Sequence, residues 1–424
     1  MSAFQSPRGT RDILPAEQRL WEEVLATARQ VAAQMGYQPF STPMYEEVGV
    51  FQRSLGKGTD IMDKELFLIS SRHGEEATYA LRPEGTAGIV RAFIQHGMQT
   101  WPQPVRLTTV TQLFRYERPQ HGRYREHVQV NFDTYGDQSA FADAWVILTM
   151  WRTLQALGLS TVKLLINSLG TQEERADYCK LLVSSLTPHH EKLSEDSKRR
   201  LELNPLRILD SKDENDQALL REIPHLIDSL TPESRTRFDT VTSYLTAWGI
   251  PFELEPRLVR GLDYYCHTAF EWVATQGSLS LSLGGGGRYD GLLPELGGPD
   301  IGAIGMGMGV DRVVQILQEL RGETATLQPE VWIVAQEQKA QQYAAGLIQE
   351  LLERNLRVQA DFGRPSFGAQ LKAAGRSGAK VALLLGLDEV NAATVTIKDL
   401  TSGEQRTIGR AEVGESIANL CQTT

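Results

Sequence analysis

The chain has 424 residues, of which 43 are basic and 53 are acidic, so its formal net charge at pH 7 is −10. Hydrophobic residues make up 41% and charged residues 23%, which is typical of a soluble globular protein and excludes disordered, collagenous and membrane-embedded chains. At roughly 100–200 residues per domain, about two to four domains are expected. The acidic balance argues against a general DNA-coating protein but allows a local basic groove.

The three cysteines, Cys179, Cys266 and Cys421, are too scattered for a disulfide framework or a zinc knuckle, which favours a reducing compartment. No segment approaches the roughly 18 apolar residues of a membrane-spanning helix, and the first residues lack the apolar core of a signal peptide. We therefore expect a soluble, cytoplasmic protein with neither a membrane nor DNA as its partner.

The first predicted elements are a helix and an extended segment. Residues 15–36 predict an amphipathic helix, because apolar residues recur at helical spacing between a proline in the first turn and a glycine at the end. Residues 37–51 predict an extended chain with two prolines, which belong at strand starts or sheet edges.

The clearest hairpin is predicted at 105–136, where two arms rich in β-forming residues flank a charged segment. In the second arm, apolar residues alternate with polar ones, and a period of two places each set on its own face. The polar set is His127, Gln129, Asn131 and Asp133. Such a face is either the floor of a ligand site or a wet surface.

The middle of the chain changes character twice. Residues 170–250 contain many charged residues and few strand signals, which predicts an inserted helical module. Strands are predicted again at 258–273 and 278–293, and residues 303–317 predict a strand that leads into a helix.

A domain boundary is predicted near 322–329, in a short polar stretch that ends in a proline. Beyond it, short apolar runs are separated by helical patterns at 337–354 and 366–376. This alternation predicts a small α/β domain around a mostly parallel sheet.

Arginines carry the strongest chemical signal. Six of them surround the hairpin tip or stand in glycine-flanked segments: Arg115, Arg118, Arg123, Arg125, Arg260 and Arg312. A guanidinium keeps its charge and binds phosphate through two parallel hydrogen bonds. A solvated turn is the alternative, but Arg115 stands at the inner end of a strand opposite the polar face, which favours an anion site.

The glycine stretches GGGGRYDGL and GMGMGVDR allow either close approach to a ligand or tight packing at a bend. Neither a P-loop nor a Rossmann fingerprint is found, so a nucleotide would be held by arginines and a β floor. No zinc-protease motif, nucleophile elbow or activated cysteine is visible, and His127 is either a base or a structural residue. The chemistry is therefore expected to rely on positioning and charge stabilisation.

At these residues the chain resembles the histidyl-tRNA synthetase family, a class II group of aminoacyl-tRNA ligases, over essentially its whole length. The matching segments, in chain order, are RGTRDILP, TPMYEEVGVF of motif 1, LRPEGT at 81–86, FRYERPQHGRYREHVQ of motif 2 at 114–129, NPLRILDSKD of the insertion at 204–213, the histidine signatures RGLDYYCHTAFEW at 260–272 and GGGGRYDGL at 284–292, and GMGMGVDR of motif 3 at 305–312.

The resemblance implies an α+β fold. It implies a class II catalytic domain at 1–325 with a six-stranded antiparallel sheet, a helical insertion at about 170–250, and an anticodon-binding α/β domain at 327–424. It also implies a histidine–tRNA ligase: histidine and ATP give histidyl-adenylate and pyrophosphate, and the histidyl group passes to the 3′ end of tRNA(His). Mg²⁺ would assist at the β- and γ-phosphates, and motif 1 implies a homodimer.

The resemblance also implies a role for each matching residue. Arg115 and Arg260 would be catalytic, one on each side of the α-phosphate, and no protein residue is assigned as a metal ligand. ATP would be bound by Arg115, Glu117, Arg123 and Arg312. Histidine would be bound by Glu84, Gly85, Thr86, Arg115, Gln129, Asp133, Arg260, Tyr264 and Tyr265. Among these, Glu84, Thr86 and Gln129 would hold the ammonium, and Asp133 and Tyr265 would bind the imidazole nitrogens in a pocket shaped by Tyr264 and Tyr289.

The chain departs from the family pattern in three places. Asp133 stands where many bacterial relatives have glutamate, and the sequence HVQVN around His127 is uncommon. Residues 366–380 lack some lysines usual in the anticodon domain, which implies that tRNA affinity depends more on the motif 2 loop.

The main alternative is a histidine-sensing regulatory subunit of ATP phosphoribosyltransferase, which shares the catalytic fold and performs no ligation. Such subunits generally lack the anticodon domain and the motif arginines, whereas this chain has both. An inactive tRNA-binding interaction protein is disfavoured for the same reason.

Overall fold

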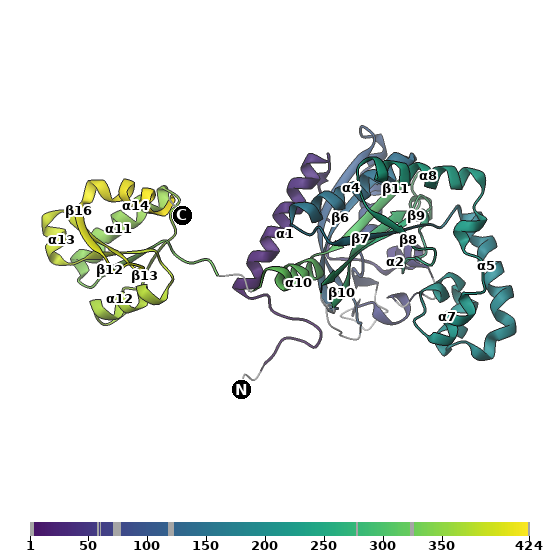
Figure 1. The fold of residues 1–424 in the computed structure, drawn as a ribbon, viewed down its shortest axis with the longest axis horizontal. Coiled ribbons are helices and arrows are strands. Elements are labelled where there is room, and N and C mark those ends of the chain that lie inside the picture. Colours follow the sequence, from purple (N-terminus) through teal and green to yellow (C-terminus); the bar gives the residue numbers. More distant parts are fainter. Residues whose placement is uncertain are drawn as a thin grey trace. The chain divides into compact units, whose positions relative to one another are not determined.

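A computed structural model of the chain describes residues 4–56, 59, 61–70, 78–117, 123–276, 279–322 and 326–422. Arg118, one of the arginines at the hairpin tip, lies outside these ranges. The contacts divide the chain into two compact units, Met1–Thr324 and Ala325–Thr424 (Figure 1). Each unit has hydrophobic cores of its own.

The first unit is built on an eight-stranded sheet in the order β1-β5-β6-β11-β10-β9-β7-β8. The strands are β1 (Gln38–Pro39), β5 (Val105–Phe114), β6 (Glu126–Tyr135), β7 (Val162–Ser168), β8 (Phe252–Leu254), β9 (Cys266–Gln276), β10 (Leu279–Arg288) and β11 (Ala303–Gly309). The six inner strands are antiparallel, while β1 and β8 pair in parallel at the edges. The implied six-stranded antiparallel sheet is confirmed, with two short edge strands added.

Four helices cover one face of this sheet: α1 (Pro15–Gln34), α4 (Ala140–Ala156), α8 (Pro232–Ala247) and α10 (Val310–Arg321). Each helix contributes apolar residues to one core, in which Trp151 of α4 stacks on Trp272 of β9 with ring centroids 5.5 Å apart. Phe238, Val241 and Leu245 of α8 are buried in this same core. Burial of large apolar side chains of this kind is the main source of stability for the sheet.

Two local predictions were partly wrong. Only 38–39 and 45–47 of the predicted extended segment 37–51 are strands, and Val48–Leu55 forms helix α2, which buries Phe51 and Leu55 at the i, i+4 spacing of one helical face. The strand predicted at 258–273 begins only at Cys266. The adjacent tyrosines Tyr264 and Tyr265 are both buried in one cluster, which a strand with alternating sides cannot achieve.

A small three-stranded sheet, in the order β2-β4-β3, lies in the same unit. Its strands and the neighbouring helices are β2 (Tyr45–Glu47), β3 (Leu68–Ile69), β4 (Tyr79–Leu81), η1 (Ile61–Glu65), α3 (Thr86–Gln95), η2 (Met98–Thr100) and α9 (Leu292–Glu295).

The segment between β7 and α8 consists of short helices: α5 (Gln172–Leu186), η3 (Thr187–Lys192), α6 (Glu195–Leu203), η4 (Pro205–Asp210), α7 (Glu214–Leu220) and η5 (Leu226–Ser229). The carboxylate of Asp216 accepts hydrogen bonds from the hydroxyls of Ser194, Ser197 and Ser211 and joins three of these helices. Leu182 and Ile208 pack in the same core as Tyr264, so the insertion is anchored beside the loop that precedes β9.

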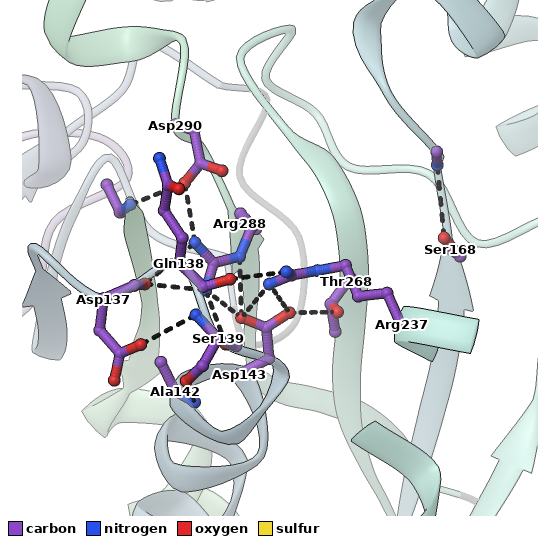
Figure 2. A network of polar contacts seen from close by, with 12 residues as sticks. Asp137, Gln138, Ser139, Ala142, Asp143, Ser168, Arg237, Thr268, Arg288 and Asp290 are labelled. Atoms are coloured by element: carbon purple, nitrogen blue, oxygen red, sulfur yellow. Dashed lines mark hydrogen bonds and ion pairs between the residues drawn. The ribbon is translucent and has the colours of Figure 1, made fainter. Parts of the chain in front are cut away.

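A buried ion pair ties the end of β10 to α4 (Figure 2). Arg288 and Asp143 are both inaccessible to solvent, and the guanidinium lies 2.5 Å from the carboxylate. Asp143 also accepts a hydrogen bond from Thr268 at 2.6 Å, and Arg288 binds Asp290 at 2.9 Å. Although burial opposes ionisation, Arg288 and Arg237 hold the pKa of Asp143 below its usual value. Losing one partner of a buried pair leaves an uncompensated charge, so this network fixes the backbone around Tyr289.

The second unit has a five-stranded sheet in the order β13-β12-β14-β15-β16. Its elements are β12 (Val331–Ala335), α11 (Gln338–Glu353), β13 (Val358–Ala360), α12 (Phe367–Arg376), β14 (Val381–Leu385), α13 (Leu387–Ala392), β15 (Thr394–Asp399), β16 (Gln405–Gly409), η6 (Arg410–Glu412) and α14 (Val413–Gln422). The first three strands are parallel and the last two antiparallel, so the expected mostly parallel sheet is in fact mixed. The β15–β16 hairpin was not predicted from the sequence, because its strands are less apolar than the fully buried β12 and β14.

Candidate active site

The floor of the site follows from the pairing of β6 with β11. Gly305 pairs with Asp133, and Met306 pairs with Phe132 in the next register position. Because side chains alternate along a strand, Met306 and Phe132 lie in the helix-covered core. The alternate residues of β6, whose side chains point to the opposite side of the sheet from Phe132, form the polar face predicted from the sequence.

Glycines make room for side chains on this face. A Cβ atom at Gly305 would lie 2.0 Å from Oδ1 of Asp133, and one at Gly307 would lie 2.6 Å from Oε1 of Gln129. On β10, a Cβ atom at Gly285 would lie 2.7 Å from Nη1 of Arg260. Gly285, Gly305 and Gly307 therefore leave room for candidate site side chains, whereas Gly284 and Gly286 allow close approach of the β11 backbone.

A cavity of about 210 Å³ opens above this floor. Eleven of the predicted site residues line it: Glu84, Gly85, Thr86, Arg115, Glu117, Arg123, Gln129, Arg260, Tyr264, Tyr265 and Arg312. His127 and Asn131 of the polar face line it as well. Segments more than 200 residues apart in the sequence thus converge on one space.

The arginines of the cavity are held by neighbouring groups. Nε of Arg115 donates to the carbonyl oxygen of Pro83 at 2.7 Å, and Nη1 of Arg312 donates to the carbonyl oxygen of Ser282 at 2.7 Å. Nη1 of Arg260 lies 3.3 Å from Oε1 of Glu271. These contacts fix the side chains while their charge remains, and a preorganised cation costs no reorganisation when an anion binds.

Glu84 stands at the start of α3. Its two carboxylate oxygens accept hydrogen bonds from the backbone N–H groups of Thr86 at 2.6 Å and Ala87 at 2.7 Å. Burial raises the pKa of Glu84, an effect that these bonds and Arg115 oppose. Each oxygen has a second lone pair, so the carboxylate can still accept a bond from a cation in the cavity.

Asp133 and Tyr289 lie beneath the cavity and are not among its lining residues, unlike the other predicted residues of the pocket. Asp133 accepts a hydrogen bond at its Oδ1 from the hydroxyl of Tyr289 at 2.6 Å. Its Oδ2 is buried without a partner in the described ranges. Burial raises the pKa of Asp133 to about 7, and the charge of Glu84 adds to the rise. A buried acceptor without a partner is costly, which indicates a place for a donor from a ligand.

His127 is neutral at physiological pH. Burial, together with the charges of Arg115 and Arg312, lowers its pKa to about 3. An imidazole with this pKa is a weak base, so the geometry favours a structural role among the arginines over proton transfer.

Several residues that line the cavity were not predicted from the sequence, among them Tyr124, Glu271, Ser282 and Asp311. Glu271 accepts a hydrogen bond from Ser282 at 2.5 Å and faces Arg260. A single acidic residue in the apolar strand segment AFEWV was the available signal. Asp311 accepts a hydrogen bond from the backbone N–H of Val128 at 3.1 Å, which only the tertiary fold brings near.

Within the described ranges, no three histidine, cysteine, aspartate or glutamate side chains come together as a metal site of protein ligands alone would require. None of the helices described is both long and apolar enough to cross a bilayer.

Two family models match the chain. The histidyl-tRNA synthetase model matches residues 9–313, and the anticodon binding domain model matches residues 330–420. The first match includes every residue of the cavity, and the second lies wholly in the second compact unit.

Curated relatives agree with these models. The chain is 44% identical to a histidine–tRNA ligase of Thermosynechococcus vestitus over 97% of this chain and 95% of the relative. It is 44% identical to a histidine–tRNA ligase of Thermus thermophilus over 96% of each chain.

Solved structures show the same fold. The apo histidyl-tRNA synthetase of S. aureus superposes with a TM-score of 0.82 at 31% identity, covering 98% of this chain and all of that one. A Bacillus halodurans protein described as an ATP phosphoribosyltransferase regulatory subunit/histidyl-tRNA synthetase has a TM-score of 0.64 at 22% identity, covering 88% of this chain and 97% of that one, a likeness in fold alone.

Proposed function

Because the chain belongs to the histidyl-tRNA synthetase family and has the activity of a histidine–tRNA ligase, we propose that histidine meets ATP in the arginine-lined cavity. The observation that carries this proposal is the presence of Arg115 and Arg260 in the wall of one cavity, above the polar face of β6. Two guanidinium groups beside one phosphate stabilise the charge that its oxygens carry during nucleophilic attack.

Histidine is bound by acceptors at one end and by a polar pair at the other. Glu84, Thr86 and Gln129 accept hydrogen bonds from the ammonium group. Oδ2 of Asp133 accepts one from the imidazole, while Tyr289 holds the other carboxylate oxygen in place. A site with buried groups that need hydrogen-bond partners rejects apolar amino acids by about 10⁴-fold or more.

In the first step a carboxylate oxygen of histidine attacks the α-phosphorus of ATP in line with the departing pyrophosphate. Arg115 and Arg260 neutralise the α-phosphate, and Arg123 and Arg312 bind the phosphates beyond it, with Glu117 helping to place the nucleotide. Catalysis of this kind rests on positioning and fixed charge, because the attacking oxygen belongs to the substrate.

Magnesium fits the donor set of this cavity. Glu117 and Glu271 are carboxylates in its wall, and Mg²⁺ in nucleotide sites takes one or two carboxylates together with phosphate oxygens. When bound, it would neutralise negative charge on the β- and γ-phosphates.

We also propose a homodimer. Around the small sheet, large apolar side chains are exposed on the surface: Met44, Tyr45, Leu68, Ile69 and Tyr79. Patches of this kind mark protein–protein contacts, and the patch includes the TPMYEEV segment that resembles motif 1. Sedimentation that shows a monomer at every concentration would contradict this proposal.

The second unit, which matches the anticodon binding domain, is proposed to bind the anticodon of tRNA(His), while the first unit receives the 3′ end. Aminoacylation for protein synthesis makes the cytoplasm the expected location.

The direct test is ATP–pyrophosphate exchange by the purified protein with magnesium, measured in turn with each of the twenty amino acids. We expect exchange with histidine alone. Exchange at background level with histidine would contradict the proposed site and favour histidine sensing.

A further inference from the structure

A second cavity, of about 320 Å³, adjoins the first and extends toward the helical insertion. Six side chains line both cavities: Arg115, Glu117, Arg123, Arg260, Glu271 and Arg312. The outer wall adds three arginines that the proposed reaction does not yet use: Arg199, Arg200 and Arg207. The outer cavity thus begins where the phosphate-binding side chains of the first one lie.

The local structure fixes these arginines close to the catalytic segment. Arg199 and Arg200 belong to α6 and Arg207 to η4, with Asn204 between the two helices. Nη1 of Arg200 donates to the carbonyl oxygen of Arg207 at 3.3 Å, and Nδ2 of Asn204 donates to Asp263 at 2.5 Å. The corner between α6 and η4 is therefore bonded to the loop that follows Arg260.

The contact with this loop is close. A Cβ atom at Gly261, the neighbour of Arg260, would lie 3.3 Å from Nη1 of Arg207. Ile208, next to Arg207, is fully buried and anchors η4 in the core. Arg207 therefore lies beside the segment that carries a catalytic arginine.

Among the described residues, the wall of the outer cavity has more arginines than carboxylates, seven against four. Arg207 lies 3.7 Å from Asp210 of the same wall, and Arg199 lies 3.7 Å from Asp63. Both distances exceed the length of a charge-assisted hydrogen bond, about 2.7–2.9 Å. A wall of this composition suits a small anion with several negative charges.

The reaction supplies such an anion on this side. A histidine oxygen forms a bond to the α-phosphorus, and the bond from that phosphorus to the α–β bridging oxygen breaks. The bridging oxygen keeps the electron pair and leaves as part of pyrophosphate, opposite the attacking oxygen. The histidine-binding residues Glu84, Gln129 and Tyr264 line only the inner cavity, so the outer one lies on the side of the leaving group.

We propose that Arg199, Arg200 and Arg207 of the insertion form the outer half of a diphosphate site, which binds the β- and γ-phosphates and the pyrophosphate they become. This inference rests on the proposed function. It gives the helical insertion a part in the first step of the reaction.

The test compares Arg199→Gln and Arg207→Gln with Arg199→Lys and Arg207→Lys in the full-length protein. Exchange is measured while pyrophosphate, ATP and histidine are varied in turn, and aminoacylation is measured while tRNA is varied. Each glutamine variant should raise the KM for pyrophosphate about tenfold, the effect of losing one charge-assisted hydrogen bond, and leave the KM for histidine within about twofold. The lysine variants should recover most of this loss, because they keep the charge.

Lys192→Gln is the matched control, since it removes a positive charge from an exposed residue of the same insertion that lines neither cavity. It should leave every KM near that of the unmodified protein. Calorimetry with imidodiphosphate, a pyrophosphate analogue, gives a second readout without turnover and should show weaker binding to Arg207→Gln.

The outcomes separate the sources of the diphosphate. A rise in the KM for both ATP and pyrophosphate means that the arginines hold the phosphates of bound ATP, and a rise for pyrophosphate alone means that they bind the product; either supports the proposal. A rise in the KM for tRNA alone would replace it with an RNA contact, and unchanged constants would overturn it. Histidine-dependent exchange by the unmodified protein, measured first, shows separately whether the proposed function holds.

Discussion

At Asp133, the stability of the free protein and the proposed binding of histidine make opposite demands. The carboxyl is fully buried, and its only hydrogen bond among the described residues, from Tyr289, uses one of its two oxygens. A ligand that donates to the second oxygen would relieve this cost. In the free protein this second oxygen is therefore an unsatisfied acceptor, and bound histidine is expected to supply the missing donor.

The pH dependence of this cost has a definite sign. The pKa of Asp133 rises from 3.8 to about 7 on folding, mainly through burial, so the folded state holds a proton that the unfolded state releases. The contribution of Asp133 to the free energy of unfolding therefore falls as pH rises from about 4 to about 7 and is constant above that. The total change is at most on the order of 4 kcal/mol.

We expect Asp133→Asn to melt several degrees above the unmodified protein at pH 8 without ligands, and the difference should shrink toward pH 4. The same variant should lose most of its affinity for histidine. Thermal melts across this pH range test it, with Asp300→Asn at an exposed position as the control. A difference in melting temperature that is constant with pH would show that Asp133 does not titrate as described.

Arg260 is the second residue with a specific prediction. Arg260→His should lower histidine-dependent exchange at least about 100-fold, because a mostly neutral imidazole cannot supply a fixed charge beside the α-phosphate. The melting temperature should change little, since the side chain faces a cavity and its ion pair with Glu271 is partly exposed. Arg260→Lys should retain more activity than the histidine variant. Near-normal exchange in Arg260→His would remove this residue from the mechanism.

At the scale of elements, strand β11 determines how the floor of the site is shaped. Its glycines alternate with Met306 and Met308, which fill the core on the other face. The strand therefore packs against the core on one side and, because its glycines lack side chains, leaves space for its neighbours on the other. The space is occupied by side chains of the neighbouring β6, so the position of those side chains depends on the absence of a Cβ atom across the strand pair.

Gly305→Ala should disturb the histidine site selectively. The new Cβ atom would lie 2.0 Å from Oδ1 of Asp133 and 2.9 Å from the hydroxyl of Tyr289, so one of them must move. We expect the KM for histidine to rise about tenfold or more, the KM for ATP to stay within about twofold, and stability to fall by about 1–3 kcal/mol.

Gly309→Ala in the same strand is the control, because its nearest contact would be at 3.6 Å, an ordinary van der Waals distance. Exchange kinetics with each substrate varied provide the measurement. An unchanged KM for histidine in Gly305→Ala would mean that the Asp133–Tyr289 pair does not contribute to binding.

At the scale of the whole molecule, the work is divided between two units. All residues of the catalytic cavity lie in the first unit, and each unit has its own core. The overall charge of −10 contrasts with the arginine-rich cavity, so the positive field is local, as the proposed binding of a phosphate-bearing substrate at one place requires.

A protein that ends at residue 322 should therefore retain histidine-dependent exchange within about threefold, provided that it folds, which its melting curve will show. Its KM for tRNA in aminoacylation should rise at least tenfold, because the unit that matches the anticodon binding domain is missing. Loss of exchange by a folded truncated protein would show that the second unit supports the first step.

The sequence by itself determined the properties that depend on local spacing. The period of two in β6 gave the polar face, and the alternation of apolar runs and helical patterns gave the second unit. The matching motifs gave the family and eleven of the residues that line the cavity. A periodicity of two or of 3.6 is set by the backbone and is visible without any knowledge of what packs against it.

Only the tertiary structure decided what depends on contacts between distant segments. Asp133 is buried because Gly305, 172 positions later, leaves space beside it, and Glu271 meets Arg260 because the chain returns through β9. The insertion arginines line the outer cavity because η4 is buried against the loop after Arg260. Burial and charge environment are properties of the surroundings of a residue, and the linear sequence does not contain those surroundings.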